Sequence, residues 1–139
     1  MKKTYTTNFD LASIDIALLV LRIGVGGLML THGTPKLINL FTSEEIQFAD
    51  PFGLGQATTL VFAVIAEFIC SILVILGLGT RLAVIPPIIT MLTAFFVIHA
   101  ADPFQRKELA LMYLLIYITL LITGAGKYAL DYYWLKKKA

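Results

Sequence analysis

Residues 57–78 read ATTLVFAVIAEFICSILVILGL and contain one charged side chain, that of Glu67. As a helix rising 1.5 Å per residue, this stretch would be about 33 Å long, close to the thickness of the hydrocarbon core of a bilayer. It is continuously apolar rather than alternating, which indicates a transmembrane helix and not a barrel strand. A charge near the centre of such a segment is costly, and it therefore marks a polar interior.

Three further apolar stretches have similar lengths: residues 15–34, 81–100 and 107–125. The sequence therefore predicts an all-α fold, an integral membrane four-transmembrane-helix bundle that forms a single domain over residues 1–139. The first stretch follows a polar, acidic start, which favours a retained span over a cleaved signal peptide. Pro86 and Pro87 predict a bend or a late start of the third helix.

The longest connection, residues 37–56, carries apolar side chains among polar ones. Two interpretations are open: a cap that folds over the mouth of the bundle, or an ordinary loop with apolar anchors.

Composition restricts the class of protein. Of the 139 residues, 58% are hydrophobic and 14% are charged, where a soluble domain carries about 25% charged residues. A net charge of +2 gives no reason to expect nucleic acid as a partner. The single cysteine, Cys70, cannot form an intramolecular disulfide or a CxxC pair.

The distribution of basic residues predicts the orientation. With four spans, both termini lie on one side of the membrane, and that side carries more cations than the other. The richer side has Lys2, Lys3, Arg81, Lys127, Lys136, Lys137 and Lys138, and the poorer side has Lys36, Arg106 and Lys107. Because basic residues are retained in the cytoplasm, we expect a multi-pass protein of the bacterial plasma (inner) membrane with both termini cytoplasmic and the 37–56 loop outside.

Two opposite charges fall at similar depth in the first and second spans. Arg22 and Glu67 would lie within about 6 Å of each other in depth if the two helices are antiparallel. Unpaired charges are costly in the bilayer, so we expect these two side chains to pair. The pair either fixes only the docking of the two helices or also lines a ligand or proton site.

A second polar group is expected near the outer face. It contains His32 and Lys36 of the first span, His99 at the end of the third and Glu108 at the start of the fourth. His32 and Lys36 share one helical face if the helix continues through Gly33, although Pro35 argues against this. Such a group could bind an anionic or carbonyl head group or relay protons. Alternatively, each histidine only makes an interfacial hydrogen bond.

The candidate binding site thus comprises Arg22, His32, Lys36, Glu67, His99 and Glu108, with no catalytic residue assigned. The two histidines and Glu67 lack the HxxxH or ExxH spacing of helical metal sites, so no metal is predicted. Gly24, Gly26 and Gly27 predict a close approach to another helix, in the same chain or in a second protomer of a homo-oligomer.

Several short motifs resemble the DoxX family of small bacterial membrane proteins. They are Arg22-Ile-Gly-Val-Gly, Thr31-His32-Gly33-Thr-Pro-Lys36-Leu37, Gly77-Leu-Gly-Thr-Arg81-Leu-Ala and Gly124-Ala-Gly-Lys-Tyr-Ala-Leu-Asp131, with Glu67 and Glu108 between them. The resemblance covers about residues 15–131 and implies a four-helix membrane bundle. It also implies a link to membrane redox systems, since the family name comes from a relative in a thiosulfate:quinone oxidoreductase. It assigns no role to any of these residues.

Three functions remain open from the sequence. The first is a subunit of a quinone-linked redox system, with quinone as the candidate cofactor and a partner redox protein as the source of electrons. The second is a transporter or binder of a small polar or lipid molecule. The third is a non-catalytic membrane scaffold whose charges are structural.

Overall fold

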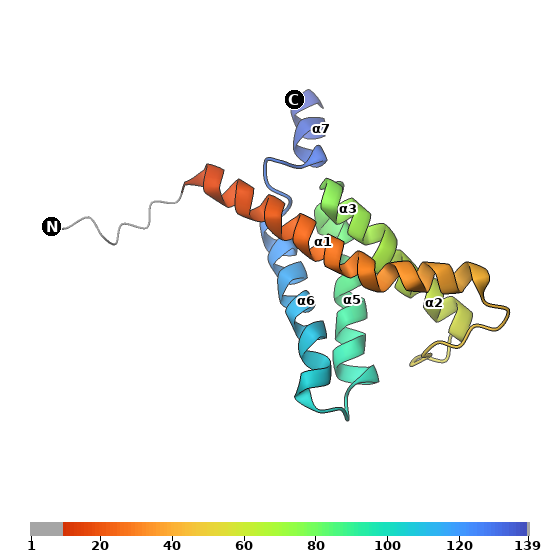
Figure 1. Cartoon of the computed structure of the whole chain (residues 1–139). Coiled ribbons are helices and arrows are strands. Elements are labelled where there is room, and N and C mark those ends of the chain that lie inside the picture. Colours follow the sequence, from red (N-terminus) through yellow and green to blue (C-terminus); the bar gives the residue numbers. More distant parts are fainter. Residues whose placement is uncertain (1–9, 139) are drawn as a thin grey trace.

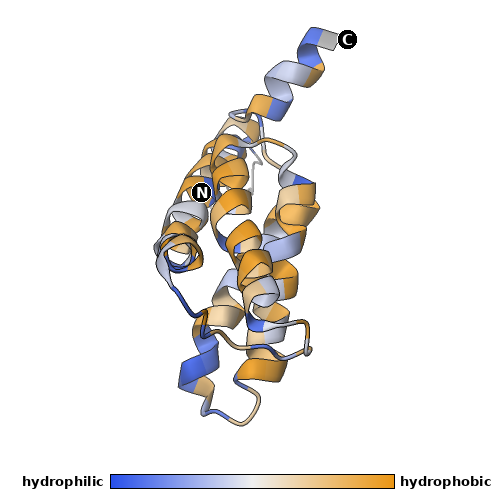
Figure 2. Ribbon diagram, turned by 90° about the vertical axis from the view of Figure 1, so that its right-hand side faces the viewer, coloured by the Kyte–Doolittle hydropathy of each residue, from blue (hydrophilic) through white to orange (hydrophobic). Residues whose placement is uncertain are grey.

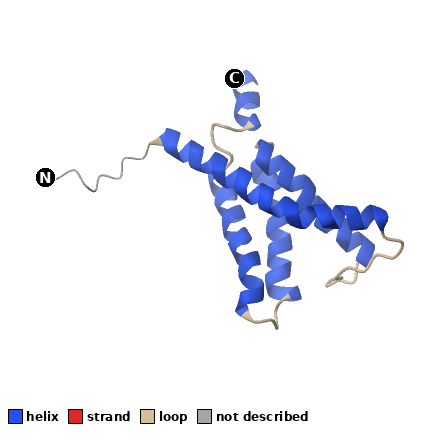
Figure 3. Cartoon of the chain, viewed as in Figure 1, coloured by secondary structure: helices blue, strands red, loops and turns tan. Residues whose placement is uncertain are grey.

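The computed structural model describes residues 10–138, and every regular element in that range is a helix (Figure 3). The elements are α1 (Leu11–Thr42), α2 (Gln56–Val64), the π-helical turn η1 (Ile65–Ile69), α3 (Cys70–Leu76), α4 (Thr80–Ala83), α5 (Ile85–Thr93), the π-helical turn η2 (Ala94–Ile98), α6 (Phe104–Thr123) and α7 (Leu130–Lys138). Figure 1 labels α1, α2, α3, α5, α6 and α7. The all-α prediction is confirmed for this range. Lys2 and Lys3, which entered the charge argument, lie outside the described residues.

Three helical segments are long and apolar enough to cross a membrane: Leu11–Thr42, Gln56–Leu76 and Thr80–Ile98. α6 is 20 residues long, but it begins with Arg106, Lys107 and Glu108 close together and is not among these three. The fourth span at 107–125 therefore stays a prediction. α7 was not expected as a helix.

α1 is longer than predicted, because it continues through Gly33 and Pro35 to Thr42. The connection that follows it is accordingly 43–55 rather than 37–56. An internal proline removes one helical hydrogen bond. The same stretch of α1 keeps Gly33 packed on η1 and Lys36 bonded to Glu67, and these contacts compensate for that loss.

The predicted irregularity at the paired prolines is confirmed. α4 ends before Val84, whose backbone lies at φ −83° and ψ −14°, and α5 then begins with Pro86 and Pro87 in its first turn. Proline is tolerated there because the first N–H groups of a helix have no partner within it.

Glycines set the distance between α1 and the segment α2–η1–α3. A Cβ on Gly26 would lie 2.5 Å from Ile75 Cγ1, and one on Gly33 would lie 2.5 Å from the carbonyl oxygen of Glu67. Gly24 and Gly27 have nothing within 4 Å of a Cβ position. The predicted close approach is thus confirmed within the chain at Gly26 and extends to Gly33, whereas at Gly24 and Gly27 an approach to a second protomer stays a prediction.

The core lies where these helices meet α5 and α6, and includes Met29, Val74 and Leu120. Large apolar side chains also cover the outer surface, for example Val20 and Ile122, which are 64% and 71% exposed. Figure 2 shows hydrophobic residues along the long helices and a hydrophilic stretch in the C-terminal helix α7. Extensive exposed apolar surface is typical of a protein that faces lipid.

Candidate functional site

A cavity of about 850 Å³ lies between α1, α2 with η1, α5 with η2, and α6. α5 packs against α6, and α1 packs along α2, η1 and α3. In Figure 1 these two groups of helices diverge, because α1 and α2 run toward the 43–55 loop and α5 and α6 run toward the turn that joins them. The lining is mainly apolar, and its ionisable side chains are His32, Lys36, Glu67, His99, Arg106 and Tyr113.

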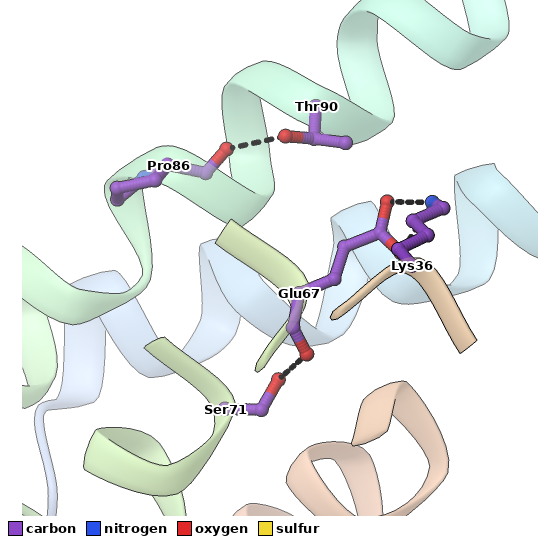
Figure 4. Close-up of polar contacts among 5 residues, drawn as sticks. All are labelled: Lys36, Glu67, Ser71, Pro86 and Thr90. Atoms are coloured by element: carbon purple, nitrogen blue, oxygen red, sulfur yellow. Dashed lines mark hydrogen bonds and ion pairs between the residues drawn. The ribbon is translucent and has the colours of Figure 1, made fainter. Parts of the chain in front are cut away.

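The central polar contact of the cavity wall is an ion pair between Lys36 of α1 and Glu67 of η1 (Figure 4). Lys36 Nζ lies 2.5 Å from both carboxylate oxygens of Glu67. The Glu67 side chain is only 3% exposed, whereas that of Lys36 is 28% exposed. The ion pair stabilises both side chains, because a buried charge without a partner is strongly destabilising.

Glu67 is held by its own backbone environment. The hydroxyl of Ser71 donates a 2.8 Å hydrogen bond to the Glu67 carbonyl oxygen, as Figure 4 shows. Gly33 packs against the same carbonyl from α1. The π-helical turn changes the helical register at Glu67, and such turns occur frequently at functional sites.

The predicted pairing of Arg22 with Glu67 is wrong. Gly33 faces the backbone of Glu67, and this contact sets the register of α1 on η1. Lys36 lies about one helical turn after Gly33 and therefore reaches Glu67. Arg22 precedes Gly33 by about 16 Å along α1. The depth argument failed because close glycine packing, and not the position of the charges, determines which turns of the two helices meet.

Arg22 belongs instead to a second polar cluster, at the opposite end of α1, which we call the end junction. Its guanidinium is fully buried, and Nη2 donates a 2.5 Å hydrogen bond to the carbonyl oxygen of Tyr128. Asp131 Oδ1 and Oδ2 accept hydrogen bonds from the backbone N–H groups of Gly79 and Thr80, at 2.9 and 3.2 Å. Gly77 packs directly against the Arg22 guanidinium.

The end junction connects three distant parts of the chain. Besides these contacts, Asp15 Oδ1 accepts a 2.9 Å hydrogen bond from the backbone N–H of Lys127. The backbone N–H of Asp131 donates to the carbonyl oxygen of Gly77 at 3.0 Å. The short motifs that contain Arg22, Gly77 and Asp131 therefore lie together in the folded chain. Their hydrogen bonds and packing give these residues a structural role.

His32 and His99 both line the cavity, from α1 and from the end of η2. The His32 ring meets the edge of Tyr113 with the ring centroids 5.9 Å apart. His99 Nδ1 lies 2.7 Å from Asp102 Oδ2, and Asp102 lies 3.9 Å from Arg106 Nη1. The hydrogen bond with His99, followed by the charges of Arg106 and Lys107, lowers the pKa of Asp102.

Glu108 is exposed and is not among the residues that line the cavity. Of the six predicted site residues, the structure thus brings together His32, Lys36, Glu67 and His99, and places Arg22 and Glu108 elsewhere. Sequence reasoning missed Asp102, Arg106 and Tyr113. His99 and Asp102 lie close together in the sequence, which was an available signal, whereas Arg106 and Tyr113 reach the cavity only through the packing of α6.

The 43–55 loop acts as a cap, which agrees with one of its two interpretations. Phe48, Pro51 and Phe52 line the cavity, and Lys36 Nζ lies 5.7 Å from the centroid of the Phe48 ring. Asp50 shapes the loop, because its carboxylate accepts hydrogen bonds from the N–H groups of Leu54 and Gly55. These bonds, with that from Gly55 the strongest, lower the pKa of Asp50.

Comparison with known proteins identifies the family. The chain is 36% identical over 124 residues to an uncharacterized protein of Haemophilus influenzae, covering 84% of this chain and 90% of that protein. It is 32% identical over 127 residues to a Bacillus subtilis protein named "Putative oxidoreductase CatD", covering 91% and 92%. No solved structure matches it. The model of the DoxX family matches residues 17–100, and the chain belongs to the DoxX family.

Proposed function

We propose that this chain is the quinone-binding membrane subunit of a redox system. The observation that carries the proposal is the cavity of about 850 Å³ with the Lys36–Glu67 ion pair in its otherwise mainly apolar wall. A cavity of this size is in the range of small-molecule sites, which combine apolar lining with a few placed polar groups. A quinone ring with its isoprenoid chain has the same combination of polar and apolar parts.

The proposal includes a membrane arrangement. α6 is the fourth span, the termini are cytoplasmic, and the cavity end with the 43–55 loop faces out of the bacterial plasma membrane. Four cavity-lining side chains, Phe62, Ile65, Ile89 and Ile98, are apolar and exposed to a large extent. These residues would face lipid, so a bilayer-soluble ligand could enter sideways between α2 and α5.

Each polar group then has a chemical task. The Lys36 ammonium donates to a ligand carbonyl oxygen, and the ion pair with Glu67 holds the ammonium in place. The imidazole of His32, which lies beside Tyr113 in the cavity wall, can donate or accept a hydrogen bond. The sequence has no CxxCH or glycine-rich cofactor motif, so the electrons come from a partner redox protein. The Bacillus subtilis relative, whose name contains "oxidoreductase", supports a redox role.

Transport is less well supported than binding. The cavity lining comes from one half of the molecule, and Arg22, Gly77 and Asp131 of the end junction are not part of it. A transport path would have to pass that junction, where Gly77 leaves no space beside Arg22.

The test is mass spectrometry of small molecules that copurify with the protein in mild detergent. The variant is Lys36→Met with Glu67→Gln, which removes both charges and leaves neither buried alone. The matched control is Lys137→Met with Glu108→Gln, which makes the same changes at exposed positions outside the cavity. We expect a quinone in the wild type and the control that is lost in the cavity variant. Identical lipid in all three would reject quinone binding and favour a scaffold.

A further inference from the structure

His99 is held in an unusual position at the end of the third long helix. Its backbone N–H bonds to the carbonyl oxygen of Ala94 at 2.9 Å, which closes the π-helical turn η2. Its ring Nδ1 lies 2.7 Å from Asp102 Oδ2. His99 lines the cavity, whereas Asp102 is not part of the lining. Nε2 is the ring nitrogen that the contact with Asp102 leaves unbonded, and we infer that it is the nitrogen available to a ligand of the cavity.

The charges around this pair decide which nitrogen carries the proton. The hydrogen bond with His99, and then the charges of Arg106 and Lys107 on α6, favour the ionised form of Asp102. An ionised carboxylate only accepts hydrogen bonds, so the proton of the short contact must be on His99 Nδ1. In a neutral imidazole the other nitrogen, Nε2, then has a free lone pair and is an acceptor.

We propose that Asp102 is a positioning residue that holds His99 as the Nδ1–H tautomer, so that Nε2 accepts a hydrogen bond from a hydroxyl group of the cavity ligand. This inference rests on the proposed function and refines it. A quinol has a hydroxyl to donate, and a quinone does not. The site should therefore prefer the reduced form of its ligand.

The remaining charged groups of the cavity serve a different part of the ligand. Lys36 and Arg106 are donors and Glu67 is bonded to Lys36, so Lys36 can meet a carbonyl or a hydroxyl oxygen equally well. With its proton on Nδ1, His99 Nε2 favours a hydroxyl over a carbonyl, because a carbonyl oxygen facing it would leave two acceptors unpaired.

The first measurement needs no ligand. The chain has two histidines, so nitrogen NMR of protein labelled at histidine, assigned with a His99→Gln variant, reports the tautomer of His99 directly. We expect the proton on Nδ1 in the wild type and in Asp102→Asn, whose amide oxygen can still accept. Asp102→Ala should lose this preference. A wild-type His99 with its proton on Nε2 would overturn the inference.

The second measurement compares the affinities for a short-chain benzoquinone and its quinol, under anaerobic conditions in nanodiscs. Asp102→Ala and His99→Gln should weaken quinol binding about 5- to 10-fold, the worth of one hydrogen bond, and change quinone binding by less than about twofold. Asp102→Asn should retain most of the preference for quinol. Glu108→Ala, an exposed acidic residue outside the cavity, is the matched control.

The two proposals fail in distinguishable ways. If the wild type binds both compounds equally, or if Asp102→Ala weakens both equally, the hydroxyl preference is wrong and quinone binding stands. If the wild type binds neither compound, the proposed function fails and the hydroxyl preference fails with it, whatever the tautomer of His99.

Discussion

The two polar clusters of this protein bury charges in different ways. In the end junction, Arg22 and Asp131 are bonded to backbone groups of Tyr128, Gly79 and Thr80. In the cavity, Lys36 and Glu67 are bonded to each other. Side chains bonded to backbone hold chain segments in place. Where two side chains face a cavity, by contrast, one of them can bind a ligand in place of the other with little movement of the backbone.

The largest expected effect comes from filling the space at Gly77. A Cβ there would overlap Arg22 Nη1 and lie 2.5 Å from Ala129 Cβ, and Gly77 has φ +71°. A left-handed conformation costs a non-glycine residue about 1–2 kcal/mol, and overpacking adds about 1–3 kcal/mol. Gly77→Ala should therefore lower the free energy of unfolding in detergent by about 3–4 kcal/mol.

Gly79→Ala is the control for Gly77→Ala. Gly79 has φ +55° but nothing within 4 Å of a Cβ position, so it should lose only the conformational part, about 1–2 kcal/mol. Equal losses in the two variants would show that the junction is not tightly packed around Arg22.

The next largest effect distinguishes the two clusters by coupling. Lys36→Met leaves Glu67 buried without its partner and should cost about 3 kcal/mol of unfolding free energy, most of which is recovered when Glu67→Gln is added. Arg22→Met combined with Glu67→Gln should instead be additive within about 0.5 kcal/mol, because these residues do not share a contact. Unfolding of the single and double variants measures both cycles. Strong coupling between Arg22 and Glu67 would contradict the observed register of α1.

A smaller effect is expected at Asp131. Asp131→Ala removes two hydrogen bonds to the Gly79 and Thr80 amides, worth about 2 kcal/mol of unfolding free energy together, and Asp131→Asn should lose about half of that. Ligand binding in the cavity should be unchanged, which separates the junction from the cavity. A variant that unfolds normally but no longer retains the copurifying ligand would show that the two clusters are linked.

The smallest effect concerns the pH dependence contributed by the cap. The pKa of Asp50 is lowered in the folded protein by the hydrogen bonds from Gly55 and Leu54. A lowered pKa means that the stabilisation is present above the unfolded pKa of about 3.9 and is lost as the pH falls through the folded value. The difference in melting temperature between the wild type and Asp50→Asn should thus be constant above about pH 5 and shrink below about pH 4. A difference that grows on acidification would reverse the sign of this contribution.

Much of the fold follows from local sequence. Continuous apolar runs must be helical in a bilayer, because every backbone N–H and C=O group has to be bonded within the segment. Likewise, four of the six predicted site residues, His32, Lys36, Glu67 and His99, line one cavity, since each is a costly charge or a titratable group within or beside an apolar run. The paired prolines also broke the third helix where expected.

What the sequence alone determined is the helical class, the positions of the apolar helices along the chain, and four of the polar residues that line the cavity. Only the tertiary structure decided their partners. Lys36 rather than Arg22 meets Glu67 because Gly33 allows the backbones of α1 and η1 to touch at that turn. Asp102 contacts His99 through the turn before α6, and Arg106 reaches the cavity through the packing of α6. Register between helices depends on close packing along their whole length, and no short stretch of sequence contains that information.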